Sequence, residues 1–390
     1  MQNFEFENPT KIIFGKGCIA KIGEEVARFG DRVMVVYGRG SIKKNGIYDQ
    51  VMESLQETGR TIVEFGGVKS NPVLSHALMG IDCARTEAVD VILAVGGGSV
   101  IDTAKTIAVG ACTTLDTDMW DFFMRRQPIT VALPIVTVVT ISASSSEMNP
   151  AAVMTKENEA QKFSIRSPHI QPKTSILDPT VLFSLSPAYS AYSAVDVITH
   201  MLEGYFNNEE PNSSLQDRLV EGLIDTVMES TRVILSDPAD YNARANMMWG
   251  AVLAFNGLTT AGMGPISLPA HMIEHSLSAI YDVAHGAGLS IVLPGWMRYT
   301  ALKTPAKFAR LAREIFSVQG DDELQVALDG IECLKTWFST IGSPISLEEV
   351  GIPKRDINSI AQNAHALAQV WGLNDYTVDV IARILTLCVE

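Results

Sequence analysis

Val91-Ile-Leu-Ala-Val-Gly-Gly-Gly-Ser-Val-Ile-Asp102 is the stretch that decides the fold. The apolar, Val- and Ile-rich run from Val91 to Val95 predicts a buried strand, and the residues after Ser99 predict a helix that extends to about Gly110. The three glycines between them allow the backbone to approach a phosphate, which the free amides of a helix N-terminus attract. Ser99 and Asp102 also have the spacing of a capping box, which is a purely structural alternative. The stretch predicts a phosphate-binding turn within an α/β domain.

Similar apolar runs, each followed by a helical pattern, surround this stretch. Asn71-Pro72 has the N-cap and N1 residues that commonly open a helix. Alternating strands and helices predict a parallel, Rossmann-like sheet with helices on both faces. Further strands are predicted at 10–14, 32–37, 61–65, 129–139 and 174–177, and helices at 43–58, after residue 71, and from the Gly15-Lys-Gly17 turn to about residue 29.

Helical periodicity dominates after Leu185, and Ser186-Pro187 has the residues of a helix start. The sequence therefore predicts an α/β domain over 1–185, whose phosphate-binding turn would hold a dinucleotide, and an all-α domain over 186–390. Helices are predicted at about 187–206, 212–235, 240–262, 267–281, 286–300, 304–317, 321–341 and 376–389.

A group of potential metal ligands lies within the predicted helical domain. Asp196 and His200 are four residues apart, as are His271 and His275, and His285 precedes Gly286-Ala-Gly288. The i,i+4 spacing places each pair on one helix face. One Asp with two or three His suits a divalent metal such as iron or zinc. Each histidine alone is more often a core residue, and the spacing does not say which of them would be left out of a four-ligand site.

The turn after the first long strand, Gly38-Arg39-Gly40-Ser41, is followed by Lys43 and Lys44 and contains no acid. An acid near the adenosine ribose is typical of NAD sites, and it would repel the 2′-phosphate of NADP. Arg39 could hold that phosphate by charge-assisted hydrogen bonds, although it could also be a solvated loop residue. The turn favours NADP, with NAD as the alternative.

Composition limits the range of partners. The formal net charge is −14, which argues against nucleic acid or an anionic membrane as a partner. No apolar run is long enough to span a bilayer, and the N-terminus lacks the features of a secretory signal. The five cysteines are scattered without metal-type spacing, which is typical of a reducing cytoplasm. We expect a cytoplasmic protein with a small-molecule substrate.

Several long stretches, in the same order, resemble the iron-containing (group III, metal-dependent) alcohol dehydrogenases. The similarity covers nearly the whole chain and is greatest to the butanol dehydrogenase and broad aldehyde reductase branch. The matching stretches are Asn8-Pro-Thr-Lys-Ile-Ile-Phe-Gly-Lys-Gly17, Tyr37-Gly-Arg-Gly-Ser-Ile-Lys-Lys-Asn-Gly-Ile-Tyr-Asp-Gln50, Gly96-Gly-Gly-Ser-Val-Ile-Asp102, Ser146-Glu-Met-Asn149, Ile176-Leu-Asp-Pro179, Asp196-Val-Ile-Thr-His200, His271-Met-Ile-Glu-His275 and Asp282-Val-Ala-His-Gly-Ala-Gly288.

The resemblance implies a dehydroquinate synthase-like fold and a role for each matched residue. It implies the metal ligands Asp196, His200, His271 and His285. His275 falls near the nicotinamide and, with Asp102 beside the pyrophosphate loop, is a candidate catalytic residue. The implied cofactor-binding residues are Gly38, Arg39, Gly40, Ser41, Gly97, Gly98, Ser99, Asp102, Thr140 and Lys162.

The resemblance also implies an activity, an oxidoreductase that transfers a hydride between NADP(H) and small primary alcohols or aldehydes with Fe²⁺ or, alternatively, Zn²⁺. A homodimer is expected, and His275 would relay a proton. The main alternative is a metal- and NAD-dependent lyase of the dehydroquinate synthase type, and a non-catalytic sensing module is a weaker one. The chain departs from the family at Ser142-Ala-Ser-Ser-Ser-Glu147, where Ser144 replaces a Thr and Ser145 replaces a Gly. Ser145 could alter this turn or tighten the pocket.

Overall fold

The computed structural model describes residues 1–208, 210 and 212–389. The chain forms two compact units, each made of separate segments. The α/β unit comprises Glu7–Leu185 and Pro238–Val252, and the helical unit comprises Met1–Phe6, Ser186–Asp237 and Leu253–Glu390. One division between the units falls after residue 185, where the domain boundary was expected. Residues 1–6 belong to the helical unit instead of the α/β unit, and residues 238–252 belong to the α/β unit instead of the helical unit.

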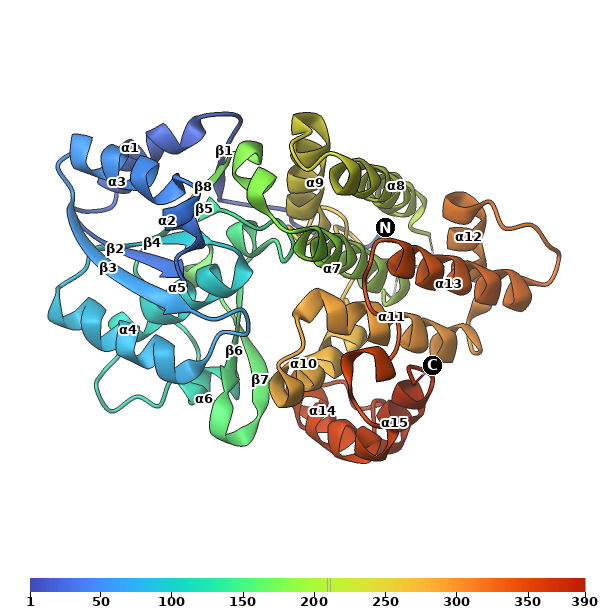
Figure 1. The fold of residues 1–390 in the computed structure, drawn as a ribbon. Coiled ribbons are helices and arrows are strands. Elements are labelled where there is room, and N and C mark those ends of the chain that lie inside the picture. Colours follow the sequence, from blue (N-terminus) through green and yellow to red (C-terminus); the bar gives the residue numbers. More distant parts are fainter. Residues whose placement is uncertain (209, 211, 390) are drawn as a thin grey trace. The chain divides into compact units, whose positions relative to one another are not determined.

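The α/β unit contains a six-stranded sheet in the order β1-β8-β5-β4-β2-β3, in which every neighbouring pair is parallel. Its central strands are fully buried apolar runs, as a sheet covered on both faces requires. In Figure 1, α1 and α3 cover one face and α4 and α5 the other, as right-handed crossovers dictate. The strands are β1 (Lys11–Phe14), β2 (Arg32–Gly38), β3 (Thr61–Val68), β4 (Val91–Gly96), β5 (Ile135–Val139) and β8 (Thr174–Leu177).

The remaining elements of this unit connect or flank the sheet. An antiparallel hairpin of β6 (Ala151–Lys156) and β7 (Gln161–Arg166) was not predicted from the sequence. The helices are α1 (Ile22–Ala27), α2 (Ser41–Lys44), α3 (Ile47–Glu57), α4 (Leu74–Thr86), α5 (Gly98–Ala111) and α6 (Trp120–Phe123), and most of α9 (Tyr241–Ala254) also belongs here. Short 3-10 helices are η1 (Cys18–Lys21), η2 (Ser146–Met148), η3 (Glu157–Glu159), η4 (Pro168–Ile170) and η5 (Pro179–Ser184).

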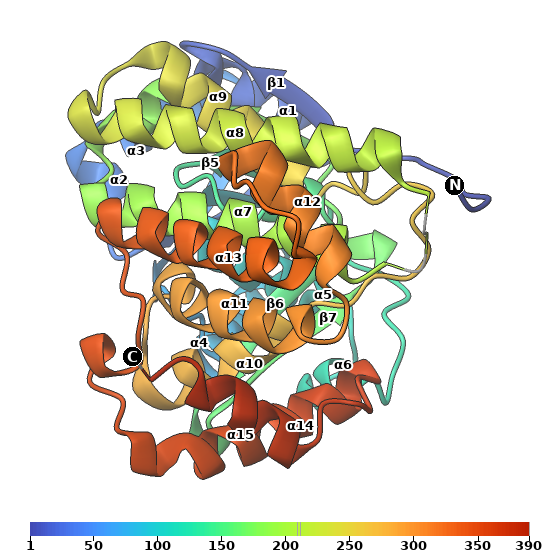
Figure 2. The same ribbon diagram turned by 90° about the vertical axis from the view of Figure 1, so that its right-hand side faces the viewer.

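The helical unit is built around α7 and α11. α7 packs against α8 and α11, and α11 also contacts α10, α13 and α15 (Figure 2). Its aromatic core includes the stacked rings of Phe206 and Phe308, whose centroids are 3.9 Å apart. The helices are α7 (Pro187–Phe206), α8 (Ser214–Ser236), α10 (Pro269–Tyr281), α11 (His285–Ala301), α12 (Pro305–Phe316), α13 (Glu323–Thr340), α14 (Ile357–Trp371) and α15 (Val378–Thr386), with 3-10 turns η6 (Glu348–Val350) and η7 (Lys354–Asp356). Among the described residues, no helix is both long and apolar enough to cross a membrane.

Helix starts were predicted with mixed success. Ser186 caps α7 by accepting from the Tyr189 amide, and Pro187 occupies the first helical position as expected. The capping box of Ser99 and Asp102 is wrong, because α5 already begins at Gly98 and both side chains bond elsewhere. The helix predicted to open at Asn71 begins instead at Leu74, because Val73 is extended and forms a bridge with Thr155, whose amide donates to the Pro72 carbonyl. The Asn71 side chain accepts from Lys162.

Candidate metal centre and dinucleotide site

Three helices of the helical unit supply the candidate metal ligands. Asp196 and His200 lie one turn apart on α7, as their spacing predicted, and both are buried. His271 lies in the first turn of α10, which begins at Pro269. Asp282, in the left-handed conformation, ends α10, so that the chain turns and His285 becomes the first residue of α11. Ligands distant in sequence are therefore contributed by a helix interior and two helix starts.

The three imidazoles converge on one carboxylate oxygen. Asp196 Oδ1 lies 3.2 Å from His200 Nδ1, 3.4 Å from His271 Nε2 and 3.7 Å from His285 Nε2. Within the described chain, Asp196 Oδ1 and His271 Nε2 are buried without a hydrogen-bond partner. Buried lone pairs without a donor are costly, and a cation bound between them would satisfy both. One carboxylate and three imidazoles are also a suitable ligand set for iron or zinc, so these residues fit a divalent metal.

The charges of the group favour a bound cation. Burial raises the pKa of Asp196, but His200 and His271 outweigh it and hold the carboxyl below its usual range. Burial lowers the pKa of His200 to about 3. Its Nδ1 lies 3.0 Å from the Asp196 backbone carbonyl, which can only accept, so the neutral ring carries its hydrogen on Nδ1 and its lone pair on Nε2. Burial would also lower the pKa of His271, yet Glu203 and Asp196 raise it to about 10. The surroundings of His271 therefore stabilise positive charge, which a metal could supply in place of a proton.

Sequence reasoning missed two carboxylates behind these ligands. Glu203 on α7 bonds His271 Nδ1, and Glu274 on α10 bonds His285 Nδ1. Neither glutamate has any exposed surface. Each occurs three residues after a predicted histidine, His200 or His271, and that spacing next to a metal-type histidine was the available signal.

His275 lies beside the group and belongs to a different subset. Its ring centroid is 5.7 Å from that of His285 and 5.7 Å from that of Trp371, with the Trp ring edge-on. The ligand atoms of Asp196, His200 and His271 lie within 4.8 Å of one another, whereas His275 meets this limit with Glu274 and His285. By this distance His285 lies with His275 and Glu274, while its Nε2 is also 3.7 Å from Asp196 Oδ1.

In the α/β unit, the glycines at the start of α5 allow a neighbouring loop to approach. A Cβ on Gly97 would lie 2.9 Å from Ile141 Cβ, and one on Gly98 would overlap Ser144 Oγ. Ser99 donates its hydroxyl hydrogen to the carbonyl of Ser70. The glycines thus serve internal packing, because side chains at these positions would overlap the loop that contains Ile141 and Ser144.

Asp102 has its carboxylate oxygens occupied by protein groups. Oδ1 accepts from Ser146 Oγ at 2.6 Å, and Oδ2 accepts from the Val153 amide at 3.0 Å. The adjacent Lys105, wholly buried on the same helix, donates to Ser146 and to backbone carbonyls beyond it. These contacts favour a structural role for Asp102, holding the 146–153 segment against α5, over the catalytic role that we expected.

The other expected dinucleotide residues lie at the ends of strands. Thr140 follows β5 and donates its amide to the carbonyl of Gly96 at 3.0 Å. Lys162, buried on β7, donates to Asn71 Oδ1 at 3.2 Å. Gly96 and Thr140 are thus at the carboxyl ends of adjacent strands, the edge at which open α/β sheets bind ligands.

The turn at residues 38–41, which is expected at the adenosine end of the cofactor, has an exposed Arg39, and Lys43 follows it in α2. Arg39 is exposed between Gly38 and Gly40, and Ser41 begins the short helix α2. Lys43 lies over the rings of Tyr37 and Tyr48 and bonds Glu64 at 3.3 Å. Lys43 is therefore committed to this internal group, which leaves Arg39 as the more available charge at the turn.

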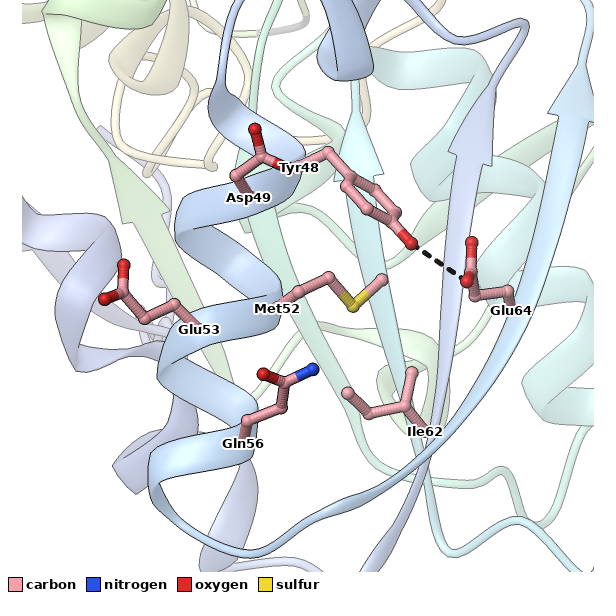
Figure 3. Close-up of a pocket in the computed structure, with 7 residues that line it drawn as sticks. All are labelled: Tyr48, Asp49, Met52, Glu53, Gln56, Ile62 and Glu64. Atoms are coloured by element: carbon pink, nitrogen blue, oxygen red, sulfur yellow. Dashed lines mark hydrogen bonds between the residues drawn. The ribbon is translucent and has the colours of Figure 1, made fainter.

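Figure 3 shows Glu64 accepting a hydrogen bond from Tyr48 at the top of a groove between α3 and β3. The groove has a volume of about 550 Å³ and is lined by Tyr48, Asp49, Met52, Glu53, Gln56, Ile62 and Glu64. None of the expected site residues lies among these, so the groove is separate from the candidate dinucleotide site.

Comparison with known proteins decides the family. Residues 9–179 match the family model described as iron-containing alcohol dehydrogenase, and residues 190–387 match that of the Fe-containing alcohol dehydrogenase family, C-terminal. The chain belongs to the iron-containing alcohol dehydrogenase family. Membership confirms the family predicted from the sequence, an alcohol dehydrogenase dependent on a nicotinamide dinucleotide, and does not support the lyase alternative.

Individual relatives of this iron-containing alcohol dehydrogenase are similar to it in sequence and structure over nearly its whole length. It is 40% identical over 379 residues to the probable NADH-dependent butanol dehydrogenase 2 of Bacillus subtilis, covering 96% of each chain. It is 34% identical to the NADPH-dependent aldehyde reductase YqhD of Escherichia coli, covering 98% of this chain and 99% of the relative. The crystal structure of NADH-dependent butanol dehydrogenase A from Thermotoga maritima superposes with a TM-score of 0.96 at 45% identity, covering 100% of this chain and 99% of the other. The predicted fold class is confirmed.

Ser145, where this alcohol dehydrogenase departs from the expected family glycine, keeps the backbone conformation that glycine favours. Its φ is +52°, in the left-handed region, and its side chain is fully buried. The hydroxyl donates to the carbonyl of Ala251 in α9, within the same unit. A left-handed non-glycine residue costs about 1–2 kcal/mol, so the hydrogen bond offsets part of the strain.

We expect Ser145→Ala to destabilise the α/β unit by about 1–2 kcal/mol, because it removes the hydrogen bond and keeps the strained backbone. Ser145→Gly should be close to neutral, since the relief of strain compensates for the lost bond. Urea unfolding of both variants measures the difference. Equal destabilisation by the two variants would show that backbone strain has no part in the effect.

Proposed function

We propose that this alcohol dehydrogenase catalyses reversible, metal-dependent hydride transfer between NADP(H) and a small primary alcohol or aldehyde of the butanol/butanal type. The observation that carries the proposal is the convergence of three histidines on Asp196, with buried lone pairs left for a cation. The substrate class is supported by the relatives, several of which are named as butanol dehydrogenases or aldehyde reductase.

Each unit has its own part in this proposal. In the helical unit, Asp196, His200, His271 and His285 hold iron(II), with zinc as the alternative. In the α/β unit, Gly97, Gly98 and Ser99 bind the pyrophosphate through backbone amides, and Thr140 and Lys162 contact the cofactor or its ribose. The bound metal supplies Lewis-acid polarisation of the substrate oxygen, and the nicotinamide supplies the hydride.

His275 is the proposed proton relay. It is buried next to His285, and its ring makes a T-shaped contact with the ring of Trp371. An imidazole can accept a proton at one nitrogen while donating from the other, which suits transfer between the substrate hydroxyl and solvent. We do not assign a catalytic role to Asp102, because its oxygens are bonded within the protein.

Steady-state reduction of butanal by NADPH, followed on protein reconstituted with iron(II), tests the proposed function. Turnover that requires the added metal is the expected result, and the same protein treated with a chelator is the control. Undiminished turnover in the chelated protein would contradict metal dependence. Absence of turnover with aldehydes from two to six carbons, with metal and both dinucleotides bound, would contradict the substrate class.

Arg39 is the proposed determinant of cofactor choice. Arg39→Ala should raise the KM for NADPH about 10- to 100-fold, because a charge-assisted hydrogen bond to the 2′-phosphate is worth about 1.5–3 kcal/mol. The KM for NADH should change little, since NADH lacks this phosphate. Lys44→Ala removes another exposed charge from the same region and is the matched control. A wild-type preference for NADH, as several relatives' names state for those proteins, would overturn the NADP proposal.

A cytoplasmic homodimer completes the proposal. The five cysteines are all free thiols, which suits a reducing compartment. β1 forms one edge of the six-stranded sheet, and an edge strand near the N-terminus can pair with its copy across a two-fold axis. Sedimentation equilibrium measures the assembly, and a monomer at micromolar concentration would contradict it.

A further inference from the structure

Two glutamates connect the three helices that bear the candidate ligands. Glu203 extends from α7 to the start of α10, and Glu274 extends from α10 to the start of α11. Both side chains are completely buried, where an ionised carboxylate is stable only if its oxygens are bonded. The hydrogen bonds of Glu203 and Glu274 must therefore compensate for the loss of hydration of two buried negative charges.

Glu203 uses its two oxygens on adjacent residues of α10. Oε1 accepts from the amide of Ala270 at 2.5 Å, and Oε2 accepts from His271 Nδ1. An ionised carboxylate can only accept, so the hydrogen of a neutral His271 ring resides on Nδ1. The lone pair is then on Nε2, the atom that lies 3.4 Å from Asp196 Oδ1.

Glu274 makes the corresponding contact with the third helix. Oε2 accepts from His285 Nδ1, and Oε1 accepts from the hydroxyl of Ser278, which also lies 3.1 Å from the Val283 carbonyl. A Cβ on Gly288 would lie 2.7 Å from Glu274 Oε1, so glycine at that position leaves room for the carboxylate. His285 Nε2 is thereby directed towards Asp196 Oδ1, 3.7 Å away.

We propose that Glu203 and Glu274 are positioning residues that fix His271 and His285 as Nδ1–H tautomers and so direct both Nε2 atoms towards the metal. Their negative charges also increase the affinity for a dication and the basicity of the two imidazoles. The inference rests on the proposed metal centre. It goes beyond that centre because it assigns the orientation of two ligands to residues that do not touch the metal.

Glutamine can make the hydrogen bonds described for Glu274, but it cannot make both of those described for Glu203. In Glu274→Gln the amide oxygen can accept from His285 Nδ1 while the amide NH₂ donates to Ser278 Oγ, whose own hydrogen goes to Val283. The contacts with His285, Ser278 and Val283 are kept while the charge is lost. In Glu203→Gln both positions face donors, the Ala270 amide and His271 Nδ1–H, and one amide oxygen cannot serve both.

The consequence of Glu203→Gln depends on which way the amide turns. With its oxygen on the Ala270 amide, its NH₂ faces His271 Nδ1, which must then accept. The ring hydrogen moves to Nε2, and a protonated Nε2 cannot bind a metal. With the opposite orientation, the Ala270 amide loses its partner at the start of α10. We therefore expect Glu203→Gln to weaken metal binding more than Glu274→Gln.

Cobalt(II) titration of the metal-free full chain, against a competing chelator and followed by visible absorption, tests this order. Glu203→Gln should weaken cobalt binding about 10- to 100-fold and shift the d–d bands, because a nitrogen ligand is lost. Glu274→Gln should weaken it less than about tenfold, with bands like those of the wild type. Glu221→Gln is the control, because it removes a buried carboxylate that bonds Tyr205 and Arg310 in the same unit, and it should bind like the wild type.

The outcomes separate this inference from the proposed function. If wild-type protein binds no cobalt at the site, the metal centre itself fails. If the wild type binds cobalt and both Glu203→Gln and Glu274→Gln bind it with wild-type affinity, the positioning role is overturned. Equal weakening of all three variants, Glu221→Gln included, also overturns it, since general loss of stability would then explain the effect. The thermal midpoint of each metal-free variant identifies unfolding, and Glu274→Gln, which keeps its hydrogen bonds, remains informative if Glu203→Gln does not fold.

Discussion

Asp196→Ala should abolish stoichiometric metal binding and lower kcat/KM for the proposed aldehyde reduction by at least about three orders of magnitude. Asp196 supplies the oxygen on which the three histidines converge, and it is the only carboxylate among the four proposed ligands. Lewis-acid stabilisation of the transition state is worth several kcal/mol, and each 1.36 kcal/mol corresponds to a factor of ten in rate. Loss of the anionic ligand also leaves the imidazoles to hold a dication without charge compensation.

Metal content by atomic absorption and kcat/KM measured on the same preparation check this expectation. Asp196→Asn keeps the shape and removes the charge, so it should lose most of the metal while folding normally. Asp217→Asn breaks the ion pair with Lys307 on other helices of the same unit and should keep full metal content and activity. An Asp196→Ala enzyme that retains one metal per chain and wild-type kcat/KM would refute the assignment of Asp196 as a ligand.

Lys105→Met should destabilise the α/β unit by about 3–5 kcal/mol, as expected when one partner of a buried charge group is removed. The ammonium donates to the carbonyls of Ser146, Asn149 and Ala151 at 2.7–2.9 Å, and the methionine cannot replace these bonds. Burial raises the pKa of Asp102 and raises that of Glu147 to about 7, and the Lys105 ammonium opposes both shifts, so its removal would make these buried carboxylates still harder to ionise. Because the same bonds secure the segment after Ser145, dinucleotide binding should weaken as well.

Urea unfolding with a fluorescence readout, together with NADPH titration, measures both effects. Lys173→Met, an exposed lysine just before β8, is the matched control and should change stability by less than about 0.5 kcal/mol. If Lys105→Met and Lys173→Met unfold at the same urea concentration, the network around Lys105 contributes nothing to stability.

The sequence predicts those elements whose local pattern and tertiary environment agree. Val91–Val95 and the glycines after it form the expected strand and turn, because a central parallel strand that is buried on both faces needs a continuous apolar run. The helix predicted at 240–262 ends at Ala254, and Gly257, at φ +96°, lies in the irregular segment that follows. The hairpin β6–β7 was missed because its strands mix charged and apolar residues without a turn dipeptide of the usual type.

The candidate site was predictable to the extent that helical spacing determines it. Asp196 and His200 share a helix face by geometry alone, but the approach of His271 and His285 depends on how three helices pack, which spacing cannot give. Glu203 and Glu274 look like ordinary charged helix residues in the sequence. Only their complete burial and their bonds to histidine reveal their importance.

The segmented composition of the two units has a consequence for biosynthesis. Helix α9 belongs mostly to the α/β unit, although the chain first passes through α7 and α8 of the helical unit. Domains usually fold in order as they leave the ribosome. Here the α/β unit cannot be complete until residue 252 has been translated. By then about 50 residues of the helical unit have been made, before the rest of that unit, residues 253–390, against which they pack. A nascent chain stopped near residue 185 should therefore remain sensitive to protease.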